Sequence, residues 1–206
     1  MTIWVWVLAC GPRHSPRPPE VVVPPEPSIQ RLPDHHVHGG TERSPDDVDM
    51  IVFHTIGGHT CQPDGSLLFS GAERDARFWR DWLESQHDRS IHYVVGREGD
   101  IAQQRPELRT AGHVGFDGVV VDVNERSIGI ELVNDGGGVE PFSEPQIAAL
   151  EWLVTGIAQR YDLGPEQLFT HAELDTRMLK APCADHRRKA DPGPRFPMER
   201  LRNALR

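Results

Sequence analysis

Short apolar runs alternate along this chain with longer segments in which apolar residues recur every three or four positions. The runs 49–54 and 127–133 have the length and character of buried strands. The segment 143–161 has its apolar residues at helical spacing, and Ser143 with Gln146 forms the pattern of a capping box at its start. Strands that alternate with helices pack as a sheet covered by helices. The sequence therefore predicts an α/β fold, a single domain with a central mixed β-sheet flanked by helices.

Other local patterns add elements to this prediction. Apolar residues spaced three and four apart favour a helix with one buried face within 71–87. The runs 91–95 and 100–103 flank a glycine-containing turn, which indicates a β-hairpin. The segment 168–171 is a short extended run that ends on a histidine, and Gly164 is expected to end the long helix before it.

Length and charge limit what the chain is expected to bind. Its 206 residues suit one domain with an appendage. Lys and Arg number 22 against 31 Asp and Glu, which gives a formal net charge of -9. Proteins that bind nucleic acid neutralise phosphates with a basic surface. We therefore expect no nucleic-acid partner, and we expect the protein to be a monomer.

The first ten residues have features of an export signal. Residues 3–9 are an apolar run, and Cys10 follows the small residue Ala9. No basic residue precedes the run, whereas export signals have a basic start and about 7–15 apolar residues. The residues 7–10 resemble the cleavage box of bacterial lipoproteins, in which the cysteine becomes a lipid-carrying N-terminus. We interpret 1–10 as a lipoprotein-like export signal with membrane anchoring through a lipidated Cys10; a frayed apolar terminus is the alternative.

Proline dominates the segment that follows. Residues 11–44 are rich in proline, which favours extended chain over packed structure. We interpret 11–44 as a linker and 45–206 as the folded domain. With Cys10 lipidated, Cys61 and Cys183 are the two cysteines left, and an oxidising compartment allows them to pair. The sequence leaves this bond open.

Two histidines stand at the ends of predicted strands, where side chains project from a rigid sheet into loops. They are His54 and His171, and Asp191 lies in a proline-containing segment near the C-terminus. Two histidines and one aspartate are a three-ligand set for catalytic zinc, with a fourth position left for water. Spacing alone does not select this set, because the two histidines lie far apart and the chain has 11 histidines. Each histidine taken singly is more typical of a structural or surface position.

Six segments, in order, resemble the zinc-dependent N-acetylmuramoyl-L-alanine amidases of the type-2 amidase and peptidoglycan-recognition fold. The resemblance extends over about residues 49–201. It rests on IVFHT at 51–55, SIHYVV at 90–95 with Gly99, AGHVG at 111–115, NERSIGIEL at 124–132, TH at 170–171 and KADPGPRF at 189–196. Six segments in the family's order make the resemblance specific.

The resemblance implies roles for five residues. His54, His171 and Asp191 match the zinc ligands of the family. Glu131 matches the carboxylate that acts as general base and then as general acid. Lys189 matches the lysine that stabilises the oxyanion of the tetrahedral intermediate. Two neutral imidazoles and one carboxylate leave bound zinc with a net positive charge, which acidifies water and polarises an amide carbonyl.

Other positions bear on the same expected site. Some members of the family carry a catalytic tyrosine just before the histidine of the second segment, and Ile91 occupies that position here. Tyr93 is interpreted as structural, which leaves Glu131 as the acid and base. His113 lies in the loop that lines the family's sugar and peptide groove, and we expect a substrate contact; a loop histidine without function is the alternative. Cys183 is a rival third ligand, although it stands out of register with the cysteine that some members use.

The function implied by the resemblance is a zinc hydrolase of the cell envelope. It would cleave the amide between the lactyl group of N-acetylmuramic acid and the L-alanine of the stem peptide, in peptidoglycan or in muropeptides. A non-catalytic peptidoglycan-binding module is the alternative, but such relatives usually lack a ligand. A cytosolic enzyme that acts on anhydro-muropeptides would share the site. The export-like N-terminus favours the periplasm or attachment to the outer membrane over the cytoplasm.

Overall fold

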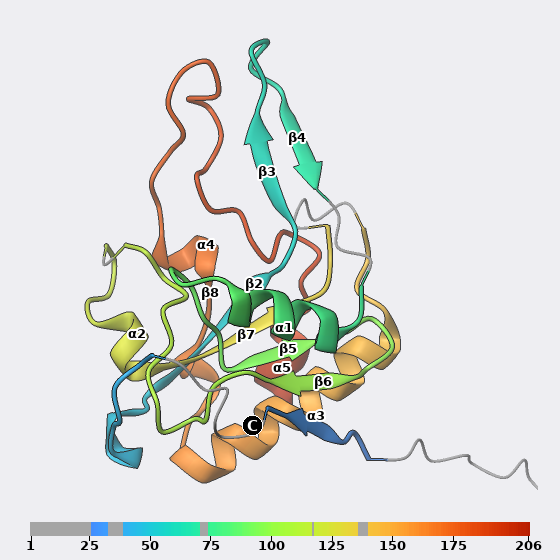
Figure 1. Cartoon of the computed structure of the whole chain (residues 1–206), viewed down its shortest axis with the longest axis vertical. Coiled ribbons are helices and arrows are strands. Elements are labelled where there is room, and N and C mark those ends of the chain that lie inside the picture. Colours follow the sequence, from blue (N-terminus) through green and yellow to red (C-terminus); the bar gives the residue numbers. More distant parts are fainter. Residues whose placement is uncertain (1–25, 33–38, 71–73, 117, 136–139) are drawn as a thin grey trace, which may run out of the picture.

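The structure is a computed structural model, and it describes residues 26–32, 39–70, 74–116, 118–135 and 140–206. Its centre is a mixed sheet of six strands in the order β1-β6-β5-β7-β2-β8 (Figure 1). β7 is parallel to both β2 and β5, β8 is parallel to β2, and β6 is antiparallel to β5. The strands of this sheet are β1 Ile29–Arg31, β2 Met50–Thr55, β5 Tyr93–Val95, β6 Ile101–Gln103, β7 Ser127–Leu132 and β8 Leu168–Thr170. The mixed sheet and the hairpin of β5 with β6 confirm the predicted fold class.

Helices cover both faces of the sheet (Figure 1). The long helix α3, Glu144–Tyr161, and the C-terminal α5, Met198–Ala204, share a hydrophobic core with one face. α1, Ala76–Ser85, packs with buried residues of β5 and β6 on the other face. The remaining short helices are the 3-10 helices Pro45–Asp47 and Pro165–Gln167, α2 Val123–Arg126 and α4 His171–Leu174. The helix expected within 71–87 is therefore present, with a later start.

Alternation along β7 separates the core from the functional face. Side chains of a strand point to opposite faces in turn. Ile128, Ile130 and Leu132 belong to the core that α3 covers. Ser127 and Glu131 consequently lie on the opposite face, which carries the candidate site described below.

The capping of α3 differs from the expected pattern in two respects. Ser143 Oγ accepts a hydrogen bond from Gln146 N at 3.3 Å, as in a capping box. The Gln146 side chain does not return to the cap; it is buried and donates to two backbone carbonyls at the ends of β5 and β7. At the other end, Asp162 adopts the left-handed conformation that closes the helix, with φ of 55°. Aspartate tolerates this conformation, so the helix ends before Gly164 is reached.

The folded part begins earlier than the expected boundary at residue 45. β1, Ile29–Arg31, pairs in parallel with β6 at the edge of the main sheet. Thr41 and Thr110 add hydrogen bonds between the same segment and the loop after β6. The second half of 11–44, expected as linker, therefore contributes a strand to the sheet. The expected signal at 1–10, with Cys10, lies outside the described residues.

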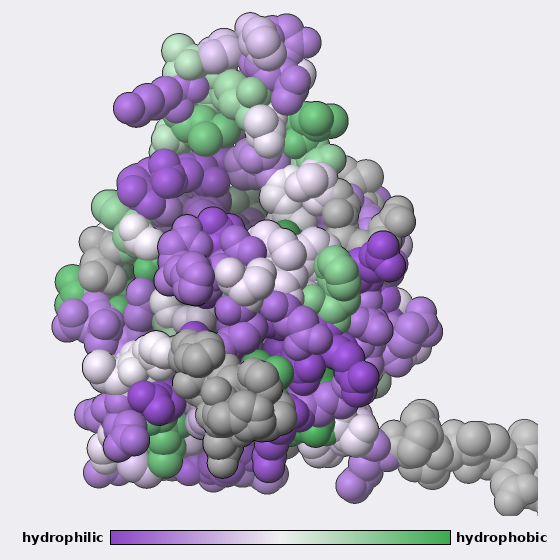
Figure 2. Space-filling view, viewed as in Figure 1, coloured by the Kyte–Doolittle hydropathy of each residue, from purple (hydrophilic) through white to green (hydrophobic). Residues whose placement is uncertain are grey.

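A second, two-stranded sheet projects from the body of the molecule (Figure 1). It is the hairpin of β3, Gly58–Cys61, and β4, Leu67–Ser70, which the sequence did not predict. Cys61 of this hairpin and Cys183 of a long C-terminal loop form a disulfide, so the pairing that the sequence left open is present. Figure 2 shows hydrophobic residues among hydrophilic ones on this projecting part, where Leu68 is exposed.

The helices of the described residues are too short or too polar to cross a bilayer. A spanning helix needs about 20 mostly apolar residues. No helix among the described ranges combines that length with that apolarity.

Candidate metal centre

The end of β2 places His54 beside Glu131 of β7. The two strands are parallel, and their register pairs Met50 with Ser127 and His54 with Glu131. Residues paired in register project to the same face of a sheet. His54 and Glu131 are therefore neighbours on the face opposite α3.

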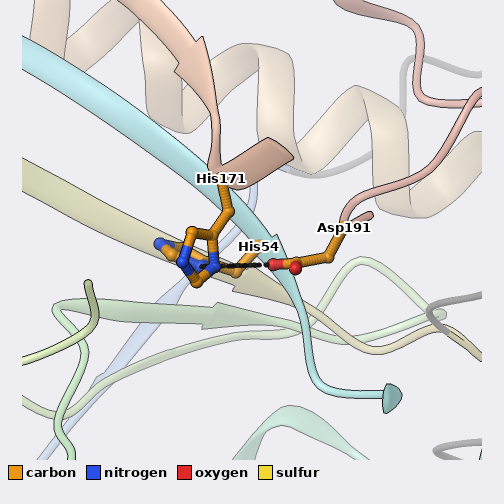
Figure 3. A group of neighbouring side chains, drawn as sticks. All are labelled: His54, His171 and Asp191. Carbon is orange, nitrogen blue, oxygen red and sulfur yellow. Dashed lines mark hydrogen bonds and ion pairs between the residues drawn. The ribbon is translucent and has the colours of Figure 1, made fainter. Parts of the chain in front are cut away.

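Two later segments bring His171 and Asp191 to the same place. β8 pairs with β2, and His171 follows it directly as the first residue of α4. The carbonyl of Asp191 accepts a backbone hydrogen bond from Ala172 N at 3.0 Å, which ties the C-terminal loop to α4. Figure 3 shows the three side chains converging from three separate segments. We call His54, His171 and Asp191 the metal cluster.

The geometry of the metal cluster suits a small cation. His54 Nδ1 and His171 Nδ1 are 2.9 Å apart. Asp191 Oδ2 lies 3.1 Å from His171 Nδ1 and 3.4 Å from His54 Nδ1. Zinc bonds of about 2.0–2.1 Å in a tetrahedron place neighbouring ligand atoms about 3.3 Å apart. The three atoms are thus spaced as zinc ligands are, and two imidazoles with one carboxylate are a donor set that zinc accepts.

The protonation states favour binding of a cation. Burial, followed by the neighbouring His171, lowers the pKa of His54 to about 4. Burial opposes ionisation of Asp191, but the adjacent His171 and His54 outweigh burial and hold its pKa well below the usual range. At neutral pH the cluster therefore offers neutral His54 and an ionised carboxylate. His171 Nε2 is buried without a hydrogen-bond partner in the described part of the chain.

Glu131 has the electrostatics of a proton-transfer group. Burial, followed by the charge of Asp191, raises the pKa of Glu131 to about 8. Its Oε2 atom is buried and has no hydrogen-bond partner among the described residues. The positive charge of Lys189 opposes the rise, so the amine of Lys189 acts on the carboxyl of Glu131. Perturbed acids beside a cleft are a mark of functional sites, although structural networks produce them too.

A groove of about 700 Å³ opens onto these residues. The metal cluster, Glu131, His113 and Lys189 all line it, and so do Arg89 and Arg188. One wall comes from the start of the β3–β4 hairpin, and the opposite wall comes from the C-terminal loop that the disulfide joins to this hairpin. Cationic side chains therefore stand on the walls of the groove.

The structure brings all six site residues expected from the sequence to one groove. His113 is further in than a surface loop residue would be, because its Nδ1 lies 2.9 Å from His54 Nε2 and its Nε2 lies 2.9 Å from Ser127 Oγ. Asn124 fixes the backbone of the same loop. Ser127 and Asn124 were not predicted, although both lie within a segment that carries the family resemblance.

The rival ligand Cys183 and the tyrosine near the second segment both lie outside the metal cluster. Cys183 is disulfide-bonded and 1% exposed, so it offers no thiolate to a cation. Tyr93 is buried in the core on the α3 side of the sheet, where its hydroxyl donates to Glu107 Oε1 at 2.6 Å. Its place agrees with the structural role expected for it.

The fold and this groove define a class of α/β proteins with a His-His-Asp cluster at the end of a mixed sheet. A family model described as N-acetylmuramoyl-L-alanine amidase matches residues 44–194. The chain belongs to this family.

Individual relatives support the same assignment. The chain is 39% identical over 128 residues to "N-acetylmuramoyl-L-alanine amidase AmiD" of Escherichia coli, a match that covers 54% of this chain and 43% of that protein. It thus spans less than half the length of that relative. It is 26% identical over 176 residues to "1,6-anhydro-N-acetylmuramyl-L-alanine amidase AmpD" of Haemophilus influenzae, covering 82% of this chain and 89% of the relative.

Solved structures are similar over most of the described fold. The Escherichia coli AmiD complex with anhydro-N-acetylmuramic acid-L-Ala-D-gamma-Glu-L-Lys superposes with a TM-score of 0.56 and 28% identity, over 77% of this chain and 57% of that chain. A selenomethionine derivative of AmpD gives a TM-score of 0.58 at 25% identity, over 86% and 94%. The type-2 amidase fold expected from the resemblance is confirmed.

Proposed function

We propose that this protein is a zinc-dependent N-acetylmuramoyl-L-alanine amidase. Its substrate would be peptidoglycan or muropeptides, and the bond cleaved would be the amide between the lactyl group of N-acetylmuramic acid and L-alanine. The observation that carries the proposal is the metal cluster beside the buried Glu131 at the floor of an open groove. The AmiD structure bound to a muropeptide, named above, supports the substrate class.

His54, His171 and Asp191 would hold the metal. Bound there, zinc supplies Lewis acidity that polarises a carbonyl oxygen and makes water more acidic. A two-histidine, one-carboxylate set leaves a coordination position free for such chemistry. Each of the three side chains is fixed by a different segment of the fold, which keeps the set in place before metal binds.

Glu131 would move the proton. A water molecule adds to the amide carbonyl carbon, and Glu131 takes the proton that the water releases. Glu131 then gives this proton to the leaving nitrogen as the carbon–nitrogen bond breaks, which leaves a lactyl carboxylic acid and a free L-alanine amine; the acid then ionises to solvent. A carboxyl whose pKa burial raises toward neutrality suits both halves of this transfer.

Lys189 would stabilise negative charge on the carbonyl oxygen. Its side chain is half-buried and lines the groove, and its charge acts on both Glu131 and His54. A fixed positive charge is most effective where water is largely excluded. His113 lines the same groove, and a substrate contact would involve its ring face, because both ring nitrogens bond within the protein.

One preparation tests the proposal. Zinc content by elemental analysis is measured on the same protein that is assayed for release of stem peptide from purified peptidoglycan. We expect one zinc per chain and new L-alanine amino termini, both lost after treatment with a chelator and restored by added zinc. Zinc without release would favour a binding module instead. Release that survives complete removal of metal would contradict the zinc chemistry.

We also propose an export address for the enzyme. The apolar run at 3–9 followed by Cys10 supports a lipoprotein-like signal over 1–10, with a proline-rich spacer ahead of the folded domain. The enzyme would then act in the cell envelope, attached to a membrane through Cys10. Mass spectrometry of the mature protein should show a diacylated Cys10 as first residue, whereas a soluble product with an intact Met1 would contradict the anchor.

A further inference from the structure

The second nitrogen of His54 is part of a buried hydrogen-bond chain. His54 Nε2 lies 2.9 Å from His113 Nδ1, and His113 Nε2 lies 2.9 Å from Ser127 Oγ. Ser127 is fully buried and its hydroxyl also contacts the carbonyl of Val123. The chain thus runs from the metal cluster across β7 to the short helix α2.

The last member of this chain sets the direction of every hydrogen bond in it. A carbonyl oxygen only accepts, so the Ser127 hydroxyl proton is donated to Val123 O. Ser127 Oγ must then accept from His113, which places a proton on His113 Nε2. A neutral imidazole carries one proton, and the two ring nitrogens of His113 face an imidazole and a hydroxyl, neither of which is an acid that would stabilise a second proton. His113 Nδ1 is consequently an acceptor.

The acceptor atom His113 Nδ1 determines the tautomer of His54. His113 Nδ1 can accept from His54 Nε2, so the single proton of the neutral His54 ring sits on Nε2. We infer that His113 and Ser127 are positioning residues that hold His54 in the Nε2–H tautomer and direct its Nδ1 lone pair at the metal. Ligating histidines depend on such outer partners for their tautomer and orientation.

The surroundings of His113 hold its ring in this place. Asn124 Oδ1 accepts from the backbone N of His113 at 3.0 Å and from that of Val114 at 2.9 Å, and its amide donates back to Val114 O. On the other side, a Cβ atom at Gly129 would lie 2.8 Å from two atoms of the His113 ring. A side chain at this position of β7 would therefore displace the His113 ring.

The two histidines of the metal cluster differ in this respect. His171 Nε2 is buried and, within the part of the chain described, makes no hydrogen bond. His54 Nε2, by contrast, is held by the hydrogen-bond chain through His113 and Ser127. The tautomer of one ligand is thereby fixed by the protein before metal binds, while that of the other is free to respond to the metal.

Zinc affinity of purified variants tests the inference, which rests on the proposed function through the identity of the metal. His113→Phe keeps a flat ring and removes the acceptor, and His113→Asn restores an acceptor oxygen near the position of Nδ1. We expect His113→Phe to weaken zinc binding by about 10- to 100-fold in competition with a chelating indicator. His113→Asn should recover most of this loss, and His87→Phe, an exposed control, should bind like the unchanged chain.

The tautomer itself is visible by NMR of the metal-free protein labelled with ¹⁵N-histidine. We expect the His54 ring, assigned with a His54→Ala variant, to carry its proton on Nε2 and to become a tautomer mixture in His113→Phe. Ser127→Ala, which deletes the anchor, should shift the mixture in the same direction. A circular dichroism melt of each variant checks that it is folded.

Two results would overturn the inference without touching the proposed function. One is a His113→Phe protein that is folded and binds zinc as tightly as the unchanged chain. The other is an Nδ1–H tautomer of His54 in the unchanged, metal-free protein. If the unchanged chain itself binds no zinc, the proposed function fails instead, and the NMR result still decides the tautomer.

Discussion

Two groups of buried and half-buried carboxylates with their partners lie on opposite faces of the same sheet, and they are built differently. One is the metal cluster with Glu131. The other, which we call the Glu107 cluster, consists of Glu107 with Tyr93, Arg160 and Tyr161. In the Glu107 cluster both carboxylate oxygens are satisfied: the two tyrosine hydroxyls donate at 2.6 and 2.8 Å, and Arg160 Nε donates at 3.0 Å.

The metal cluster has the opposite arrangement. Its ring nitrogens and its carboxylate oxygen face one another, and Glu131 Oε2 has no partner among the described residues. The two buried glutamates respond accordingly. Burial raises the pKa of Glu131, whereas at Glu107 the hydrogen bonds from Arg160 and Tyr93 outweigh burial and lower it. A polar cluster that is complete stabilises the fold, and one with converging lone pairs is suited to a cation and to chemistry.

The largest effect is expected from removing a ligand. Asp191→Ala deletes one of the three protein donors. Four-ligand zinc sites typically bind with about 10–16 kcal/mol, so one ligand accounts for about a quarter of that, or roughly 10²–10³-fold in affinity. We expect the variant to contain no stoichiometric zinc and to release no stem peptide. Elemental analysis checks this, with Glu107→Gln as the matched carboxylate change outside the cluster. A full equivalent of zinc in Asp191→Ala would remove Asp191 from the ligand set.

The next effect separates metal binding from proton transfer. Glu131→Gln keeps the size of the side chain and removes its ability to take up a proton. Because general acid and base groups contribute about 10²–10⁴ in rate, we expect turnover to fall by that factor while the zinc content stays at that of the unchanged protein. Kinetics with a muropeptide substrate measure the turnover, and elemental analysis measures the zinc content. Activity close to that of the unchanged protein would exclude Glu131 from the mechanism.

A smaller effect, on stability alone, is expected in the Glu107 cluster. Glu107→Gln removes a charge that three side chains contact and leaves buried donors poorly matched, which costs about 1–3 kcal/mol. We expect a lower free energy of unfolding in urea and an unchanged zinc content and specific activity. An equally stable variant would mean that this cluster adds nothing to the fold, and an inactive but stable one would break the distinction between the two clusters.

Much of the fold follows from local pattern. The apolar runs at 49–54 and 127–133 became β2 and β7, and the helical periodicity after Ser143 became α3, because each pattern reflects which side of one element is buried. The hairpin β3–β4 was missed because it projects from the body: β3 alternates between exposed and half-buried positions, and β4 is mostly exposed and has only a three-residue apolar run. β1 was missed because its proline-rich surroundings favour extended chain, which a strand edge can also use.

The candidate site was predicted through the family resemblance, and spacing could not have supplied it. His54 and His171 meet only because β8 pairs with β2, a contact between distant segments. The positioning role of Ser127 could not be predicted from the sequence, because it depends on which neighbour accepts its proton. The Glu107 cluster also depends on contacts between distant segments. It joins β5, the loop after β6 and the end of α3, so no local sequence pattern predicts it.

The pH dependence of stability should differ in sign between the two buried glutamates. In the metal-free protein the folded-state pKa of Glu131 is about 8, against an ordinary value of 4.5. Between these values the folded state keeps a proton that the unfolded state has lost, so Glu131 makes the free energy of unfolding fall as pH rises. The pKa of Glu107 is lowered, so its stabilising contribution is present above about pH 4.5 and is lost as pH falls further.

Urea unfolding of chelator-treated protein across pH 3–9 resolves the two contributions, because each proton changes the free energy by at most about 1.4 kcal/mol per pH unit. The lowered pKa values of His54 and His113 act in the opposite sense to Glu131 below about pH 6.5, so the test is the difference between the curves of variant and unchanged protein. The stability of the unchanged protein relative to Glu131→Gln should fall between about pH 4.5 and 8 and stay constant in acid. The stability of the unchanged protein relative to Glu107→Gln should instead be lost as pH falls below about 4.5 and stay constant above it. Added zinc should reduce the first difference, because a nearby positive charge favours the ionised form of Glu131. Parallel curves for the two variants would show that both carboxyls occupy equivalent environments, and the contrast between a complete polar cluster and an open one would then have no electrostatic basis.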